Sequence, residues 1–246
     1  MNQYATYSLQ GCAEPVSSLS HLFGAILFAA LTIRLVRLTI ATSEASGEGP
    51  GRLMSVCIFA SSAVILLSIS GIYHLLPFDS ARRELFLQLD YVAIYLLIAG
   101  TFTPCCWLLL AGFHRRVMLI VIWGLAVTGI VISLFFSEMM PDRWNIAFYL
   151  IIGWAGLISG KSVSRRHGLS ILEPLLLGGA AYTTGVAFIL AGRPEPLPGV
   201  VGPHELFHLA VLVGIGCHWR LVTRLAEGQF AQPELAPVLS TRTSGA

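Results

Sequence analysis

Apolar residues fill most of the chain in seven long runs, each separated from the next by a short segment that is polar or contains Gly and Pro. A helix needs about 20 predominantly apolar residues to cross a hydrocarbon core about 30 Å thick. Helices satisfy their own backbone hydrogen bonds in lipid, so a helical bundle is the expected architecture. The pattern predicts seven transmembrane helices near residues 19–40, 53–76, 87–110, 116–137, 145–160, 171–191 and 204–223.

The composition supports an all-α membrane protein, a seven-transmembrane helix bundle. Hydrophobic residues make up 55% of the chain, charged residues 11%, and the mean hydropathy is +0.76. Soluble domains carry about 25% charged residues. We expect one membrane domain over residues 1–227 and a polar tail over 228–246. The start of the chain lacks the basic region of a signal peptide, so we expect the first helix to be retained.

Net charge and cysteine spacing argue against a nucleic-acid partner and against a zinc site built from cysteines. The net charge of +2 is too small to indicate a nucleic-acid partner. No Cys-x-x-Cys occurs, so we do not expect a sulfur-based zinc site. Buried cysteines usually behave as small hydrophobic residues. We interpret all five in that way: Cys12, Cys57, Cys105, Cys106 and Cys217.

Seven crossings also determine on which side of the membrane each helix end lies. Odd-numbered helices begin, and even-numbered helices end, on one common side. An ionisable residue at membrane depth is costly and indicates function by default. We expect His218 near the opposite interface, because it lies ten residues after His208 in the last helix. The ionisable residues on the common side are Glu14, His21, His74, Asp90, His204 and His208.

Three of these residues form the predicted metal site. His204 and His208 are four residues apart on a helix, so both imidazoles face the same direction. His74 ends the second helix on the same side of the membrane. Three imidazoles with one open position are typical of catalytic Zn²⁺, whereas structural zinc has four protein ligands. The alternative is that the histidines are buried polar residues satisfied by hydrogen bonds.

Asp90 and Ser70 are the predicted catalytic residues. Asp90 would act as general base toward a water that zinc activates, or would orient a histidine from outside the ligand set. Ser70 lies one turn before His74 and would bind that water or a developing oxyanion. The alternative for Asp90 is a helix cap or an ion pair with Arg83. We expect His21 to lie outside the ligand set or at the membrane interface.

The segment from His204 to His208 also fits His-Glu-x-x-His, the signature of zinc metalloproteases. In that interpretation Glu205 is the general base and Glu227 the third ligand. If the apolar run after His208 forms one helix, Glu227 lies about 28 Å away, across the membrane. We therefore favour the ligand set that includes His74.

Basic residues predict the orientation, because Lys and Arg are enriched in cytoplasmic segments. Four Lys and Arg residues lie on the side of the membrane that carries the histidines, and eleven lie on the other side. This difference places the histidine side and the N-terminus outside, and the C-terminus in the cytoplasm. Fourteen arginines against one lysine suggest a bacterial gene, and hence the inner membrane. The four on the histidine side are Arg82, Arg83, Arg143 and Arg193; the others are Arg34, Arg37, Arg52, Arg115, Arg116, Lys161, Arg165, Arg166, Arg220, Arg224 and Arg242.

The motifs resemble the hemolysin III family, the bacterial branch of the progestin and adipoQ receptor group, which is related to alkaline ceramidases. The resemblance extends over nearly the whole chain. Ser17 and Ser20 stand where the family usually has Asn and Thr. The matching segments are Glu14 with His21 and Gly24, Ser70 to His74, Leu89 to Pro104, Gly178 to Gly185, His204 to His208, and His218.

The resemblance implies Zn²⁺ held by His74, His204 and His208, with Asp90 and Ser70 beside it. Relatives of this group resemble lipid amidases, so we expect a zinc-dependent hydrolase of lipid amide or ester bonds with a lipid-like substrate in the membrane. The alternative is a receptor-like or pore-forming cytolysin with a structural zinc. Receptor members of the group are drawn with the N-terminus inside, which is the alternative orientation. The oligomeric state does not follow from the sequence.

Overall fold

The computed structural model describes residues 12–46, 49–136 and 142–229. Seven segments within these ranges are helices long and apolar enough to cross a membrane, which confirms the all-α, multi-pass architecture. The predicted tail lies almost entirely outside the described residues, as does Arg242. The helices are α1 (Pro15–Ser46), α2 (Gly51–Leu75), α3 (Arg83–Leu109), α4 (Gly112–Phe135), α5 (Asp142–Trp154), α6 (Leu157–His167), α7 (Leu172–Ala191) and α8 (Pro203–Ala226), with a short 3₁₀ turn, η2 (Leu169–Ile171), before α7.

The fifth span differs from the prediction of one helix over residues 145–160. It consists of α5 and α6 and extends to His167, so the segment expected to be a loop after Lys161 is helical. The helix is interrupted at residues 155–156, where Gly156 lies against the Phe102 ring of α3. A Cβ atom there would come within 2.9 Å of that ring. Glycine also lowers helix propensity by about 1 kcal/mol, so the break occurs where packing and propensity agree.

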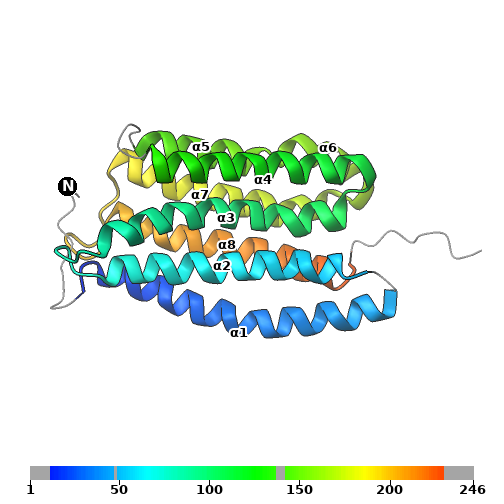
Figure 1. The fold of residues 1–246 in the computed structure, drawn as a ribbon, viewed down its shortest axis with the longest axis horizontal. Helices are drawn as coiled ribbons and strands as arrows, with labels where there is room; N and C mark the ends of the chain where they lie inside the picture. The colour runs from blue at the N-terminus through cyan, green and yellow to red at the C-terminus, as the bar shows by residue number, and fades with distance from the viewer. Residues whose placement is uncertain (1–11, 47–48, 137–141, 230–246) are drawn as a thin grey trace, which may run out of the picture.

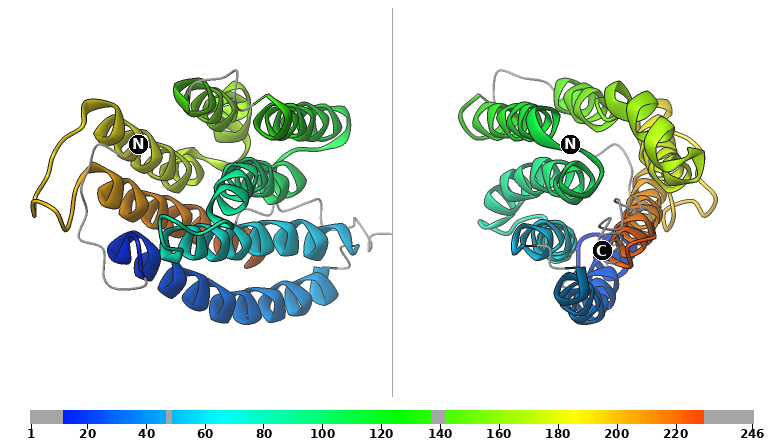
Figure 2. Two further views of the ribbon diagram at one scale, coloured as in Figure 1. Left: turned by 60° about the vertical axis from the view of Figure 1, so that its left-hand side comes forward. Right: turned by 90° about the vertical axis from the view of Figure 1, so that its right-hand side faces the viewer.

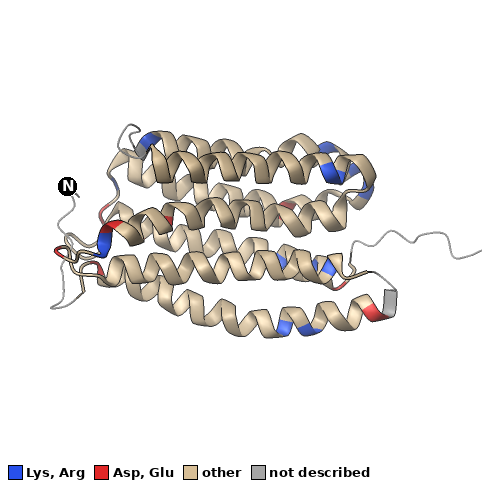
Figure 3. Cartoon of the chain, viewed as in Figure 1, with Lys and Arg blue, Asp and Glu red and all other residues tan. Residues whose placement is uncertain are grey.

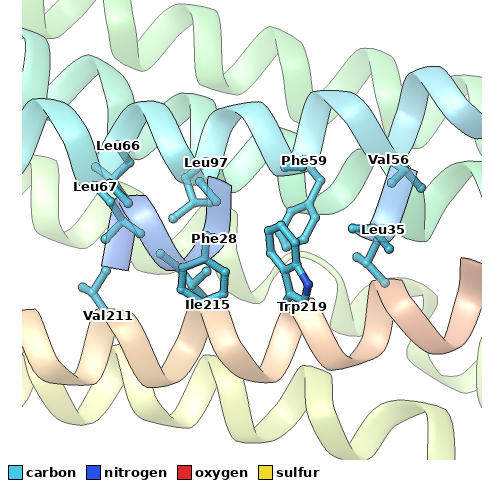
Figure 4. Packing of buried hydrophobic residues seen from close by; sticks show 14 of the residues in the cluster. Phe28, Leu35, Val56, Phe59, Leu66, Leu67, Leu97, Val211, Ile215 and Trp219 are labelled. Atoms are coloured by element: carbon cyan, nitrogen blue, oxygen red, sulfur yellow. The ribbon is translucent and has the colours of Figure 1, made fainter. Parts of the chain in front are cut away.

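The helices run roughly parallel to one another and follow each other around the bundle (Figures 1 and 2). Residues of α1, α2, α3 and α8 pack together in one core cluster that includes aromatic rings. The Trp219 ring lies 4.9 Å from the Phe28 ring and 5.4 Å from the Phe59 ring, between centroids (Figure 4). Buried aromatic side chains contribute strongly to core stability, so this cluster holds α8 against α1 and α2.

Charged residues mark the two ends of the bundle. Figure 3 shows that Lys and Arg gather toward the end at which α1, α3 and α8 finish. The opposite end holds the beginnings of α1, α3 and α8 and the end of α2, and it carries most of the predicted site residues. We call it the histidine end, defined by Glu14, His21, His74, His204 and His208.

Candidate metal centre

Three imidazoles from two helices converge at the histidine end. The ligand atoms of His74, His204 and His208 all lie within 4.8 Å of one another. The Nε2 atoms of His204 and His208 are 3.0 Å apart, and the His74 ring lies 4.9 and 4.5 Å from the other two rings, between centroids. Zinc binds imidazole nitrogen at about 2.0–2.1 Å, so small side-chain adjustments bring all three to one ion. The donor set fits a metal with an open fourth position.

Glu14 accepts a hydrogen bond from the His74 ring nitrogen Nδ1. Its Oε2 atom is 2.6 Å from His74 Nδ1 and accepts a second hydrogen bond, of 2.8 Å, from Arg83 Nη2. Burial raises the pKa of the Glu14 carboxyl, but the hydrogen bonds from His74 and Arg83 and the nearby imidazoles of His74 and His204 outweigh this and lower it to about 2. The carboxylate is therefore charged and is a strong acceptor.

Arg83 connects this pair to the end of α2. Its Nη1 atom donates to the carbonyl oxygens of Tyr73 and Leu76, at 3.2 and 2.6 Å. Its guanidinium also lies 4.5 Å from the Tyr73 ring centroid. The predicted alternative in which Arg83 pairs with Asp90 is therefore wrong, because Arg83 is engaged by Glu14 and by the last carbonyls of α2.

His21 contacts His208 at its Nδ1 atom, as Glu14 contacts His74. The two rings lie 4.1 Å apart, and His208 Nδ1 is 3.1 Å from the ring nitrogens of His21. His21 Nε2 also lies 3.3 Å from the His208 carbonyl oxygen. Since His21 is only 2% exposed, it belongs to the site and not to the membrane interface.

A cavity of about 400 Å³ begins at the three histidines and continues between the helices. Ser70 and Asp90 line it close to the histidines, and Leu109 and Leu221 line it near the other end of the bundle. The Ser70 side chain lies against the Asp90 carboxyl, whose Oδ1 atom has no hydrogen-bond partner among the described residues. The structure thus brings both predicted catalytic residues to the wall that carries His74.

Glu205 performs a structural task. Its Oε2 atom accepts a hydrogen bond of 2.9 Å from the Gly202 backbone N–H, which caps α8, and its Oε1 atom accepts one of 3.3 Å from Ser17. A carboxylate at this helix position is a common N-terminal cap. Glu205 does not line the cavity. The glutamate of the His-Glu-x-x-His segment is therefore engaged in the scaffold and is not available as the base that a protease requires.

His218 lies elsewhere than the predicted interface. It is 7% exposed and lines the middle of the cavity, next to Tyr182 of α7. A Cβ atom at Gly178 would come within 2.5 Å of His218 Nε2, so this glycine admits the ring between α7 and α8. Neither ring nitrogen of His218 has a hydrogen-bond partner in the part of the chain that the structure describes.

The sequence contained a signal for the outer contacts. Glu14, Ser17, Ser18 and His21 have the spacing i, i+3, i+4 and i+7, which places polar side chains on one face of a helix in an otherwise apolar span. A polar stripe within a membrane span must face protein, so this spacing indicates a buried contact. The partners of the four side chains do not follow from the spacing.

Comparison with known proteins relates the chain to haemolysin-III proteins and to adiponectin receptors. Residues 10–219 match the family model described as Haemolysin-III related. The chain is 32% identical to Hemolysin-3 of Bacillus cereus over 82% of its length and 86% of the relative's. It is 30% identical to the Hemolysin-3 homolog of Bacillus subtilis (strain 168), over 66% of the chain and 72% of the relative. It is also 28% identical to the Adiponectin receptor protein of Drosophila melanogaster, over 84% of the chain and 49% of that protein.

Proposed function

The chain belongs to the haemolysin-III related family of integral membrane proteins, and we propose that it is a hydrolase that uses Zn²⁺ to cleave an amide or ester bond of a membrane lipid. One observation carries this proposal. The three imidazoles border an elongated apolar cavity that also presents a carboxyl group, one oxygen of which has no partner among the described residues. A purely structural metal would not require such a cavity or such a carboxyl.

Zinc bound by three histidines supplies a Lewis acid with an open position and lowers the pKa of a bound water to about 7. Asp90 would accept the proton of the attacking water, since its carboxyl lines the same cavity as the histidines. The Ser70 hydroxyl would hold that carboxyl in place or donate to the oxyanion that develops. Neither residue is needed to bind the metal.

The cavity supports a lipid as substrate. Its volume of about 400 Å³ lies within the range of small-molecule sites, and most of its lining is apolar. Asp90 and Leu109 of α3 both line it and lie nineteen residues apart, which corresponds to about 28 Å along a helix. An acyl chain would lie along this length, with the bond to be cleaved beside His74 and Asp90.

The decisive experiment measures zinc per chain and lipid turnover in the same detergent-purified samples. Wild type should contain about one zinc and hydrolyse a ceramide-like amide or an ester lipid. His74→Ala should lose both, whereas His114→Ala, which changes an exposed histidine on α4, should retain both. Zinc without turnover of any lipid amide or ester would reject the hydrolase. Wild type without zinc would reject the metal centre as well.

A second candidate function comes from the name of a relative. The Bacillus cereus relative is called Hemolysin-3, so the chain is also a candidate cytolysin in which zinc has a structural role. Its ionisable site residues gather at one end, while the cavity lining elsewhere is mostly apolar, which disfavours an aqueous pore. Dye release from liposomes by zinc-free protein at the wild-type rate would favour the cytolysin.

We also propose that the histidine end faces outward across the inner membrane. The support is the excess of Lys and Arg toward the opposite end (Figure 3). A reporter fused after residue 246 that is active only in the cytoplasm would test this orientation. Activity there is expected, and activity of a reporter that folds only outside would reverse the assignment.

A further inference from the structure

Three side chains at the beginning of α1, and that of Glu14 directly before it, contact α2 and α8 at the histidine end. Two of them touch imidazoles: Glu14 bonds to His74 and His21 to His208. The other two touch the scaffold, because Ser18 Oγ donates to the Gly71 carbonyl at 2.9 Å and Ser17 Oγ donates to Glu205. These four side chains therefore combine contacts to the proposed ligands with contacts that only hold helices together.

The contact with Glu14 selects one tautomer of His74. A carboxylate can only accept hydrogen bonds, so the short contact between its Oε2 and His74 Nδ1 requires a proton on Nδ1. In a neutral imidazole Nε2 then carries the lone pair. This nitrogen is the one left for an ion shared with His204 and His208.

The contacts of His21 select the same tautomer of His208 by two steps. The His208 carbonyl oxygen can only accept, so the His21 Nε2 atom beside it carries the proton. His208 Nδ1 lies 3.1 Å from both ring nitrogens of His21. Since His21 Nε2 donates to the carbonyl oxygen, we assign Nδ1 of His21 as the acceptor to which His208 Nδ1 donates. The lone pair of His208 is thereby on Nε2, the atom that lies 3.0 Å from His204 Nε2.

We propose that Glu14 and His21 are positioning residues, which hold His74 and His208 in the Nδ1–H tautomer so that both present Nε2 to the metal. This inference rests on the zinc binding of the proposed function, but not on its hydrolytic reaction. Hydrogen bonds to the outer nitrogen of a metal-bound histidine fix its tautomer and ring orientation, and losing them typically weakens metal affinity 10- to 100-fold. Here α1, which contributes no ligand, and the residue directly before it supply the two partners.

Close approach of α1 to α2 makes this arrangement feasible. A Cβ atom at Gly71 would lie 2.7 Å from the Leu22 side chain, so the absence of a side chain there lets the two helices meet. The Glu14 backbone N–H also donates to the His74 carbonyl oxygen, at 3.0 Å. Pro15 begins α1 with a backbone angle that suits the first helical position. The Glu14 side chain is thus fixed relative to His74 by backbone contacts as well.

The first test is zinc affinity, measured by chelator competition on the full-length chain in detergent. Glu14→Ala and His21→Phe should each weaken zinc binding 10- to 100-fold. Glu14→Gln should lose less, because its amide oxygen still accepts from His74. Ser18→Ala is the matched control, since it removes a bond from the same face to a backbone carbonyl. It should lower the unfolding temperature and leave zinc affinity within about threefold.

The second test is ¹⁵N NMR of histidine-labelled, metal-free protein, which reports tautomers directly. Wild type should show His74 and His208 protonated at Nδ1. Glu14→Ala should remove this preference at His74 alone, and His21→Phe should remove it at His208 alone. General destabilisation of the protein cannot produce effects that are specific to one histidine in each variant. Protonation at Nε2 in wild type would overturn the proposal, as would a Ser18→Ala loss of affinity equal to that of Glu14→Ala.

The outcomes separate this inference from the proposed function. If wild type binds zinc and the variants behave as stated but no lipid is hydrolysed, the hydrolase is rejected and the positioning role stands. If wild type hydrolyses lipid and the variants retain full zinc affinity, the positioning role is rejected alone. If wild type binds no zinc, both are rejected.

Discussion

At each end of the bundle an arginine donates hydrogen bonds to the last carbonyl groups of a helix; Arg52 is buried and Arg83 half-buried. At the histidine end, Arg83 reaches the carbonyls of Tyr73 and Leu76 at the end of α2. At the opposite end, Arg52 reaches the carbonyls of Leu225 and Ala226 at the end of α8, at 3.1 and 2.8 Å. Helix ends leave such carbonyls without intrahelical partners, and in a bilayer the cost of leaving them unpaired is large.

The difference lies in what Arg83 does with its remaining donors. It also bonds to Glu14, which bonds to His74, so the cap at the histidine end is continuous with the proposed metal centre. Arg52 starts α2 and His74 lies twenty-two residues later, about 33 Å along a helix, so its cap cannot touch the histidines. The same kind of arginine cap thus stands apart from the histidines at one end and is bonded to the proposed metal centre at the other.

Removing a proposed ligand is the strongest way to test this division. His208→Ala should reduce zinc from about one per chain to nearly none, and lipid turnover to background. The affinity loss should exceed the 10- to 100-fold change typical of outer contacts, because a direct metal bond is lost. Elemental analysis and a turnover assay on the same sample measure both. Full zinc content in this variant would show that His208 is not a zinc ligand and would reject the proposed metal centre.

Changing Asp90 should separate binding from catalysis at the same end. Asp90→Asn keeps the size of the side chain and removes the base, so zinc content should stay near one while turnover falls about 10²- to 10⁴-fold. Zinc analysis and a turnover assay measure the two quantities, and the exposed variant His114→Ala controls for differences between preparations. Normal turnover by Asp90→Asn would show that the general-base assignment is wrong.

The two arginines allow a direct comparison of the ends. Arg83→Ala and Arg52→Ala should each destabilise the protein by about 1.5–3 kcal/mol, the range for hydrogen bonds to charged groups. Zinc affinity should fall only in Arg83→Ala, because Glu14 then loses the partner that holds it against His74. Thermal unfolding in detergent and chelator competition measure the two quantities. An equal loss of affinity in Arg52→Ala would mean that the ends are not independent.

His218 should give the smallest effect. His218→Leu removes two ring nitrogens that have no partner among the described residues, so stability should change by less than about 1 kcal/mol. Zinc affinity should match wild type, since ten residues of α8 separate His218 from His208, about 15 Å. Both are measured as for the arginine variants. A marked loss of zinc in His218→Leu would extend the metal centre into the middle of the bundle.

Some of this protein follows from the sequence alone. The seven spans are local properties of hydropathy and length, and six of them needed only boundary changes of a few residues at most ends. The pairing of His204 with His208 follows from helix geometry. The addition of His74 and Asp90 follows from counting crossings, because lipid forces each span through the whole membrane. The addition of Ser70 follows from its place one helical turn before His74. The structure brings the ligand atoms of the three histidines within 4.8 Å of one another, and Asp90 and Ser70 line the cavity that begins there.

The tertiary structure decided what local pattern does not encode. An ion pair between Arg83 and Asp90 was one alternative, and Arg83 bonds to Glu14 instead. Glu205 matches a protease base and caps α8, and His218 was expected at an interface and is buried. At the break between α5 and α6, Gly156 lies against the Phe102 ring of another helix. Apart from the local cap that Glu205 makes with Gly202, these outcomes are choices among partners from different helices, and they are fixed by how closely the helices approach. Periodicity sets the face of a side chain, and packing selects the atom it meets.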